Sequence, residues 1–426
     1  MRAERPPRFY GWYVVGCSVL IYFFTNGLSL YVPQNLFPRF METFGATPAE
    51  VSRTTAITFV LAGFIAPFVG AAIDRLGVVR VIRMGLIVLA LTFSAYPFAQ
   101  NLQQLYVLHA AIAVGLVFAG LMSNIVLLSN WFITRRGTVV GLLVAGSSLA
   151  GATLPVSIAP LVNDPTLGWR VGFGVLAAAF WLFAVLPGFL VLRESPRLVG
   201  QFPDGAAVAP AGTSDGEALR EGVPFADALR SRTLWCLAIG SASIWFSIQA
   251  ITSQFTIYLE KDAGFQPLQA TQLYSLLLAC SVAGKFLFGA ISDRFTKRSM
   301  MLVASIMLLA GCLQLFKLDG EVPGLTQDHL QLTVFAIVFG LGFGGSFTLI
   351  QLVAVEYFGQ LALGRILGVI IFIDTMGAAL GTLLAGQIRT SSGDYFLSFS
   401  VVTVVAMIAV LNVLMIPAVA RSGSEQ

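Results

Sequence analysis

The sequence predicts an all-α polytopic membrane protein with twelve transmembrane helices in two pseudo-symmetric six-helix halves. The chain has 426 residues, of which 57% are hydrophobic and only 11% are charged, whereas about 25% of the residues of a soluble domain are charged. Its apolar runs are about 20 residues long, which is enough to cross a bilayer. These features exclude a soluble globular protein, and the runs lack the alternation of a membrane β-barrel.

Apolar runs bounded by charges and turn residues define the twelve expected spans. They cover residues 11–33, 52–73, 80–99, 104–127, 137–161, 170–192, 234–258, 270–291, 299–317, 331–355, 364–387 and 395–419. The longest hydrophilic stretch follows the sixth run. It divides the chain into an N-terminal half of residues 1–192, a cytoplasmic linker of residues 193–232 and a C-terminal half of residues 233–426. The low-complexity run from Asp204 to Asp215 predicts a flexible linker.

The distribution of basic residues predicts the orientation. With the amino terminus in the cytoplasm, 18 of the 25 Lys and Arg residues lie on that side: Arg2, Arg5, Arg8, Arg75, Arg80, Arg83, Arg135, Arg136, Arg193, Arg197, Arg220, Arg230, Arg232, Arg294, Lys297, Arg298, Arg365 and Arg421. Six lie on the other side: Arg39, Arg53, Arg170, Lys261, Lys317 and Arg389. Basic residues are retained on the cytoplasmic side, so both termini are expected there.

Two sequence elements recur in the two halves. Gly70 is followed by Asp74 and Arg75 between the second and third spans, and Gly289 is followed by Asp293 and Arg294 between the eighth and ninth. An acid with basic neighbours in such a short loop can hold helix ends together. We therefore expect Asp74, Arg75, Arg80, Arg136, Asp293, Arg294 and Arg365 to form a gate on the cytoplasmic side when the other side is open.

The second recurring element lies inside the spans. Gly141 precedes Ser147 in the fifth span with the same spacing that separates Gly368 from Asp374 in the eleventh. Each follows a cytoplasmic arginine. Two six-helix halves with repeated elements are typical of secondary transporters, which bind substrate near the midplane between the halves.

At these residues the chain resembles the major facilitator superfamily, whose signature is Gly-x3-Asp-Arg-x-Gly-x-basic-basic. The first copy departs from the signature at Val78 and Val79, and the second has Thr296 in the glycine position. The opening residues 10–15 (YGWYVV) and residues 44–52 (FGATPAEVS) resemble bacterial members of the monocarboxylate transporter and oxalate:formate antiporter group. The resemblance implies a bacterial inner (plasma) membrane protein.

Two charges fall well inside predicted spans and require an explanation. Lys285 is eight residues from Asp293, and Asp374 is nine residues from Arg365, which corresponds to about 12 and 13.5 Å of helix. Both would lie near the centre of a hydrocarbon core about 30 Å thick. An unpaired charge there is expensive, so the sequence favours a pair, either structural or functional.

The resemblance gives these two positions a role. Transporters of the group carry a cation, generally arginine, in the position of Lys285, and the oxalate antiporters carry a lysine in the position of Asp374. One cation and one acid imply a monoanion, or a zwitterion, rather than a dianion. We expect Lys285 to bind a carboxylate and Asp374 to carry a proton, with the two paired in the empty transporter.

Other polar residues in the spans are weaker candidates for substrate contact, because such residues more often join helices. They are Asn26, Tyr31, Asn124, Ser147 and Gln249. The expected partners are a small organic anion, protons and the lipid bilayer, with no nucleic acid and no obligatory protein partner. No cofactor or metal ion is expected, because the four cysteines and two histidines show no ligand spacing.

Three other functions remain as alternatives to a proton-coupled symporter. A broad-specificity drug or metabolite exporter has less use for an intramembrane lysine, and an anion exchanger of the oxalate:formate type would need no proton. A membrane receptor would need a signalling domain, which no loop is long enough to form. An enzyme is not expected, because the chain has no Walker loop, GxSxG or HExxH motif.

Overall fold

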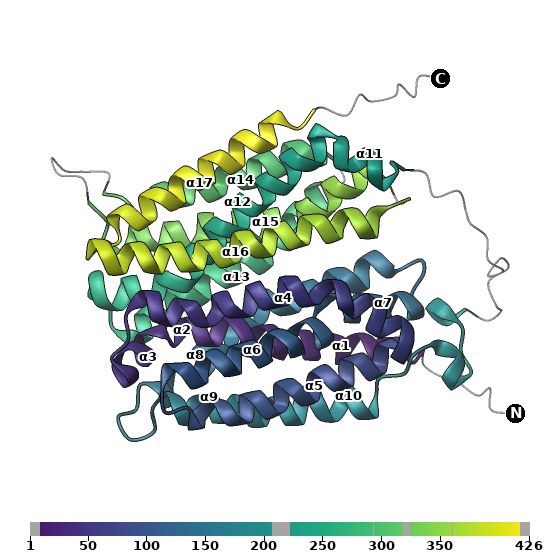
Figure 1. Ribbon diagram of the computed structural model, residues 1–426, viewed down its shortest axis with the longest axis horizontal. Coiled ribbons are helices and arrows are strands. Elements are labelled where there is room, and N and C mark those ends of the chain that lie inside the picture. The colour runs from purple at the N-terminus through teal and green to yellow at the C-terminus, as the bar shows by residue number, and fades with distance from the viewer. Residues whose placement is uncertain (1–8, 207–221, 293, 318–323, 360, 418–426) are drawn as a thin grey trace, which may run out of the picture.

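The computed structural model describes residues 9–206, 222–292, 294–317, 324–359 and 361–417. These residues form helices that run mainly along one axis (Figure 1). Eleven helical segments among them are long and apolar enough to cross a membrane, which confirms the all-α class. The expected basic residues Arg2, Arg5, Arg8, Arg220 and Arg421 lie outside the described residues.

The helices pack as two bundles (Figure 1). The first bundle contains α1 (Gly11–Asn26), η1 (Gly27–Tyr31), α2 (Val32–Asn35), α3 (Phe37–Phe44), α4 (Pro48–Leu76), α5 (Val78–Ala95), η2 (Tyr96–Phe98), α6 (Leu102–Ala119), α7 (Leu121–Trp131), α8 (Arg136–Val162), α9 (Gly168–Phe180), η3 (Trp181–Val185) and α10 (Leu186–Leu190). The second contains α12 (Arg232–Ile257), η6 (Tyr258–Asp262), α13 (Pro267–Ile291), α14 (Lys297–Leu313), α15 (His329–Phe358), α16 (Leu363–Ser392) and α17 (Phe396–Met415). Along the chain, three short elements come between the two bundles: η4 (Pro196–Val199), η5 (Pro203–Gly205) and α11 (Phe225–Arg230).

Local sequence signals fix the ends of α4, the helix that precedes the first recurring loop. Thr47 accepts a hydrogen bond from the Glu50 backbone N–H, and the Glu50 carboxylate accepts one from the Thr47 backbone N–H. This reciprocal capping satisfies two donors that a helix start leaves free. The helix ends at Gly77, whose φ of +85° is a conformation that favours glycine.

The largest contacts between the bundles are those of α4 with α16 and of α8 with α13, and α12 also contacts α2, α3 and α4. Glycines allow close approach within the second bundle. A side chain at Gly344 would collide with the α13 backbone at Ser281, and one at Gly377 would collide with the α12 backbone at Ala242. Small residues at helix contacts are the usual means of close packing in a membrane.

Three segments differ from the sequence expectation. The fourth span is interrupted at Gly120, between α6 and α7, and the Asn124 side chain donates to the carbonyls of Ala119 and Gly120, both at 2.8 Å. The first span continues through a π-helical turn, η1, into α2. The ninth ends at Leu313, because the chain then turns and pairs Phe316 with Leu325.

The beginning of the expected flexible linker is attached to the first bundle. The Glu194 carboxylate accepts hydrogen bonds from the backbone N–H groups of Val78 (2.7 Å) and Val79 (3.2 Å) at the start of α5. Asp204 accepts hydrogen bonds from the N–H groups of Ile133 and Thr134. Residues 193–205 are therefore held in place, whereas 207–221 lie outside the described residues.

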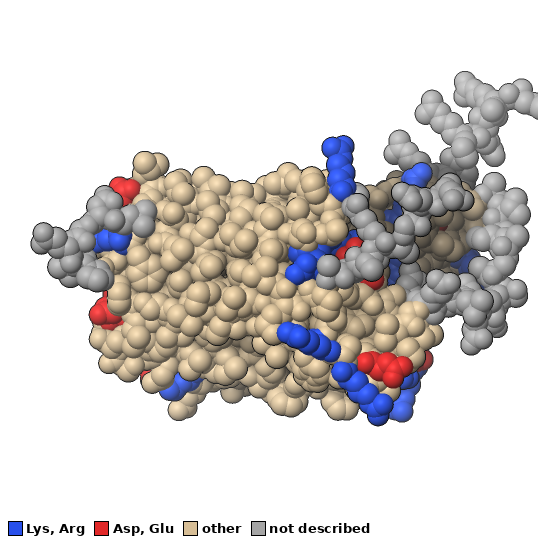
Figure 2. Space-filling model, turned by 90° about the horizontal axis from the view of Figure 1, so that it is seen from above, with Lys and Arg blue, Asp and Glu red and all other residues tan. Residues whose placement is uncertain are grey.

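The long molecule has two distinct ends. We call the end at which α10 and α11 lie the linker end, and the opposite end, where α3 lies, the α3 end (Figure 1). Charged side chains on the face shown in Figure 2 gather toward these ends and leave an uncharged band between them. Such a band matches the hydrocarbon core of a bilayer.

Candidate functional site

Lys285 lies on α13, at the contact between the bundles. Its Nζ donates a hydrogen bond to the Val144 carbonyl of α8 (3.1 Å) and lies 4.4 Å from the centre of the Phe347 ring of α15. The residue is only 6% exposed. None of the five ion pairs among the described residues includes Lys285, so its charge is balanced by a carbonyl and a ring face alone.

Several predicted residues surround this lysine. Ser147, on the turn of α8 after Val144, lies with its hydroxyl 3.4 Å from that of Tyr31 in η1. The neighbouring Ser148 hydroxyl is 3.1 Å from that of Ser281, one turn before Lys285 on α13. The structure thus brings Lys285, Tyr31 and Ser147 to one region, where η1, α8 and α13 meet.

Asp374 lies on α16 and contacts α12. Its Oδ1 accepts a hydrogen bond of 2.6 Å from the Ser241 hydroxyl, and the residue is 7% exposed. Sequence reasoning missed Ser241, because a serine in an apolar span is usually bonded to its own helix. Ser241 also bonds its own helix, at the Ala238 carbonyl.

The expected pairing of Lys285 with Asp374 is wrong for this conformation. Neither residue belongs to an ion pair among the described residues. The reason lies in the packing: α13 lies against α8 and α15, whereas α16 lies against α4 and α12. Helical rise gives two residues a common depth, but it does not place them on the same side of the molecule.

The remaining candidates separate into two groups. Gln249 of α12 reaches the other bundle, where its Oε1 accepts a hydrogen bond of 2.9 Å from Gln34 of α2. Asn26 and Asn124 make local bonds instead: Asn26 donates to Tyr22 of its own helix (3.5 Å), and Asn124 caps the broken fourth span. All three residues are buried.

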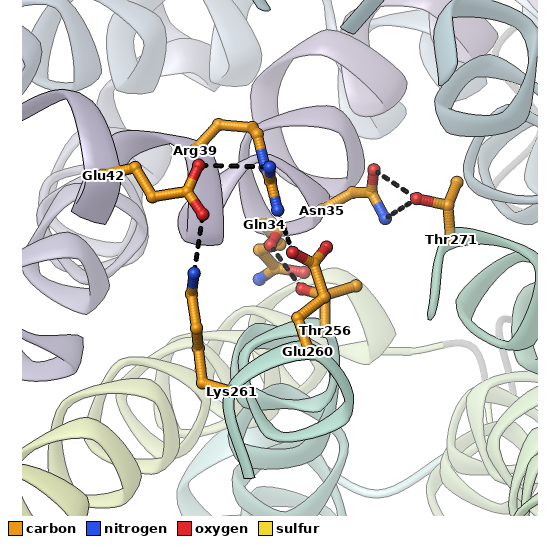
Figure 3. Close-up of polar contacts among 8 residues, drawn as sticks. All are labelled: Gln34, Asn35, Arg39, Glu42, Thr256, Glu260, Lys261 and Thr271. Atoms are coloured by element: carbon orange, nitrogen blue, oxygen red, sulfur yellow. Dashed lines mark hydrogen bonds and ion pairs between the residues drawn. The ribbon is translucent and has the colours of Figure 1, made fainter. Parts of the chain in front are cut away.

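The α3 end carries a cluster of four charged residues that sequence reasoning assigned no role (Figure 3). We call Arg39, Glu42, Glu260 and Lys261 the α3-end cluster. Arg39 of α3 pairs with Glu260 of η6 and with Glu42 (3.1 Å), and Lys261 of η6 pairs with Glu42 at 2.6 Å. Two of these three ion pairs join the bundles.

Neutral hydrogen bonds extend the contact beneath this cluster (Figure 3). Thr256 donates to the Gln34 carbonyl (3.1 Å), and the Asn35 amide donates to the Thr271 hydroxyl (3.3 Å). Asp262, the residue after Lys261, pairs with Arg389 of α16 at 2.8 Å. The π-helical turn η6 thus has three consecutive charged residues in ion pairs, and two of them, Glu260 and Lys261, pair with the other bundle.

The predicted gate residues at the linker end differ from the α3-end cluster in exposure and in ion pairing. Asp74, Arg75, Arg80, Arg136, Arg294 and Arg365 are all exposed and belong to none of the ion pairs found in the described part of the chain. Asp293 lies outside the described residues. Open space adjoins Gly141 of α8 and Gly368 of α16 near this end.

Comparison with known proteins identifies the family. The sequence model of the Major Facilitator Superfamily matches residues 19–320 and 277–426. The chain belongs to this superfamily. Major facilitator proteins are transporters, and the apolar helices make this one an integral membrane protein. The predicted resemblance is therefore confirmed.

Individual relatives of this major facilitator protein are distant but similar along most of its length. The uncharacterized MFS-type transporter YcxA of Bacillus subtilis (strain 168) is 24% identical, and the match covers 90% of this chain and 90% of the relative. Monocarboxylate transporter 2 of Homo sapiens is 23% identical, with 94% of this chain and 85% of the relative covered. The agnestins efflux protein AgnL12 of Paecilomyces divaricatus is 25% identical, over 77% of this chain and 69% of its own.

A solved structure shares the fold. It is a bacterial homologue of the human lysosomal transporter Spinster, in an inward-facing and occupied conformation. The TM-score is 0.72 at 18% sequence identity, and the match covers 96% of this chain and 97% of the other.

Proposed function

We propose that this major facilitator protein is a secondary active transporter of a small organic monocarboxylate, coupled to protons and working by alternating access. The observation that carries the proposal is the state of Lys285. It is a buried cation in an intramembrane position with no acidic partner among the described residues. A buried charge without a counter-charge is costly, and a carboxylate would supply one.

Asp374 is proposed to carry the coupled proton. Its carboxyl group is buried and has one hydroxyl donor, Ser241. A proton on Asp374 and an anion on Lys285 leave both sites neutral, although the two side chains do not touch. The two bundles then rearrange around sites that bear no net charge, which couples proton and anion movement without a direct ion pair.

The same proposal includes the topology. α14 has 17 residues, within the range of about 17–25 that crosses a bilayer, and it packs against α15 and α17. It would be the twelfth span. We place both termini and the 193–232 segment in the cytoplasm of a bacterium, in its inner membrane, because the basic residues gather at that end, and we assign residues 1–192 and 233–426 to the two moving halves.

In this topology the α3 end is the outer side. Its ion pairs close the outer side, and the exposed gate residues at the linker end leave the inner side open. The conformation is therefore inward-facing. In the outward-facing state Asp74 and Asp293 would engage the cytoplasmic helix ends as the α3-end cluster separates.

Uptake into proteoliposomes tests the function. The full chain is reconstituted, a pH gradient is imposed with the outside acidic, and uptake of labelled short monocarboxylates is followed. Lys285→Ala removes the cation proposed to bind the carboxylate, so binding and uptake should be lost. Asp374→Asn mimics the protonated acid, so it should retain exchange of labelled for unlabelled acid but lose accumulation driven by pH.

Matched variants separate these effects from general damage. Lys317→Ala and Asp227→Asn remove the same charges from exposed positions outside the proposed sites and should transport normally. If Asp374→Asn still accumulates acid in response to pH, the proton is carried elsewhere. If Lys285→Ala binds the acid as well as the wild type does, the anion site is wrongly assigned.

A metabolite exporter is the second candidate. The efflux protein among the relatives favours it, as does the separation of Asp374 from Lys285, because an isolated acid suits proton-driven export of neutral or cationic compounds. An exporter would show uptake of dyes or drugs into vesicles with an acidic lumen and no response to monocarboxylates. An anion exchanger of the oxalate:formate type would transport only when an organic anion is present on both sides of the membrane, and a pH gradient would not drive it.

A further inference from the structure

Trp245 of α12 has an environment unlike that of the other tryptophans. Four of the six indole N–H groups donate hydrogen bonds: those of Trp131, Trp169, Trp181 and Trp235. Trp12 is 43% exposed. Trp245 is half-buried, and its N–H donates no hydrogen bond to another of the described residues. An indole N–H in a protein interior usually finds an acceptor.

The neighbours of Trp245 place it where the two bundles meet. It packs against Leu30 of η1, Phe59 of α4 and the pair Ala378 and Ala379 of α16. Its ring also contacts Phe343 and Phe347 of α15 edge-on, at 6.3 and 5.7 Å between ring centres. Residues of both bundles therefore lie beside the indole.

Phe347 connects this tryptophan to the proposed anion site. Its ring centre is 4.4 Å from Lys285 Nζ and 5.7 Å from the Trp245 ring centre, so the ammonium and the indole are at most about 10 Å apart. The apolar ring of Phe347 lies between the Lys285 ammonium and the indole of Trp245. A carboxylate avoids the electron-rich face of such a ring, so the apolar body of the substrate must lie against it.

We infer that Trp245 selects the substrate, and that the substrate is a monocarboxylate with a planar aromatic body and an acceptor oxygen at its far end. This inference rests on the proposed function. Lys285 holds the carboxylate, Phe347 and Trp245 contact the ring, and the Trp245 N–H donates to the distal oxygen. Each of the three contacts corresponds to one chemical feature of the substrate: the carboxylate, the ring or the distal oxygen. A probe that lacks one feature therefore lacks one contact.

Three labelled probes test the inference in proteoliposomes of the full chain. Acetate has the carboxylate alone, benzoate adds the ring, and 4-methoxybenzoate adds the distal acceptor. The apparent affinity of the wild type should rise about threefold to tenfold at each step, which is the usual worth of one aromatic contact or one hydrogen bond.

Two substitutions remove these steps in turn. Trp245→Phe keeps a ring but loses the N–H, so 4-methoxybenzoate should fall to the level of benzoate. Trp245→Leu loses the ring as well as the N–H, so benzoate and 4-methoxybenzoate should both fall toward acetate and keep only the contact with Phe347. Acetate uptake and its pH response should persist in both variants, which shows that they fold. Trp181→Phe removes an indole whose N–H donates to Ser94, and it should change none of the three affinities.

The outcomes distinguish this inference from the function on which it rests. A wild type that moves none of the probes overturns the proposed monocarboxylate transport. A wild type that moves acetate as well as benzoate leaves that function standing and overturns the aromatic substrate. Full retention of the 4-methoxybenzoate preference in Trp245→Phe overturns the role of the N–H.

Discussion

The two ends of the molecule carry similar residues in opposite states. At the α3 end, Arg39, Lys261 and Arg389 are paired with acids on neighbouring helices. At the linker end, Arg75, Arg136 and the other described gate residues are exposed and outside the ion pairs of the described residues. Under the proposed alternating access, this difference corresponds to a molecule that is closed at the α3 end.

A small number of charged residues connects the two bundles at the α3 end. Glu260 and Arg39 have side chains that are only 7% and 19% exposed, so their interaction is less screened than that of a surface pair. The neutral bonds from Gln34 and Asn35 continue the contact inward. The closed state is therefore a layered interface, and each layer can be tested separately.

The largest expected effect comes from locking the α3 end. In a background without the four native cysteines, Asn35→Cys and Thr271→Cys are joined by a short bifunctional thiol reagent. With a bis-methanethiosulfonate, which forms a disulfide with each cysteine, transport should be abolished because the bundles can no longer separate there, and a reductant that cleaves these disulfides should restore it. The matched control is Lys297→Cys with Glu356→Cys, a pair 3.7 Å apart within the second bundle, which should keep full activity when joined. Unchanged transport in the locked protein would show that this end does not open.

Weakening the same end should produce the next largest effect. Glu260→Gln leaves the Arg39 guanidinium without its carboxylate, at a cost on the order of 2 kcal/mol for a largely buried pair, which is about thirtyfold in the balance of the two states. Maleimide labelling of a cysteine at Asn35 should become faster. Exchanging the charges, Arg39→Glu with Glu260→Arg, should restore the wild-type rate if the pair acts as a closure, and it should not if Glu260 has another role.

A smaller effect is expected from the linker end. Asp74→Asn removes an exposed acid that has no ion-pair partner in this conformation, so folding should be unaffected and only the opposite state should lose a contact. Transport should slow about twofold to fivefold, as for one exposed pair. Labelling of a cysteine at Gly141, beside open space, should increase. Normal transport with unchanged labelling would remove Asp74 from the gate.

The smallest effect concerns the attached part of the linker. Partial burial opposes the charge of Asp204, but the backbone N–H groups of Thr134 and Ile133 outweigh it and hold its pKa below the ordinary value of 3.8. The attachment is therefore fully present above about pH 4 and is lost as the pH falls through the lowered pKa. Limited proteolysis after Arg197 should become faster at low pH, and Asp204→Asn should be cut rapidly at neutral pH. Equal rates of cleavage of the wild type and Asp204→Asn at neutral pH would show that Asp204 does not attach this segment to the first bundle.

Sequence reasoning recovered what depends on local pattern. Hydropathy predicted the helical class, and the paired Gly-x3-Asp-Arg loops predicted the family. The spans were found within a few residues, but the break at Gly120 was missed, because a single glycine in an apolar run does not reveal that the Asn124 side chain can donate to the carbonyls of Ala119 and Gly120.

The site was less predictable, because it depends on which helix faces which. Arg39 and Glu260 are 221 positions apart, and each appears in the sequence as an ordinary charge at the end of a span. Lys285 and Asp374 were singled out by their depth in the predicted membrane spans, which follows from the helical rise per residue. Their partners, Val144 and Ser241, follow from the packing of α8 with α13 and of α12 with α16, which no spacing in the sequence encodes.

The attachment of the chain on both sides of residues 207–221 has a consequence for how such a protein is assembled. Asp204 fastens the preceding residues to the first bundle, and the Val223 backbone N–H bonds the Phe358 carbonyl of the second at 2.9 Å. The chain is therefore held to a bundle on each side of this segment, and the bundles contact each other mainly through α4, α8, α13 and α16. A protein made as two separate polypeptides, divided between residues 207 and 221, should reassemble in the membrane and transport.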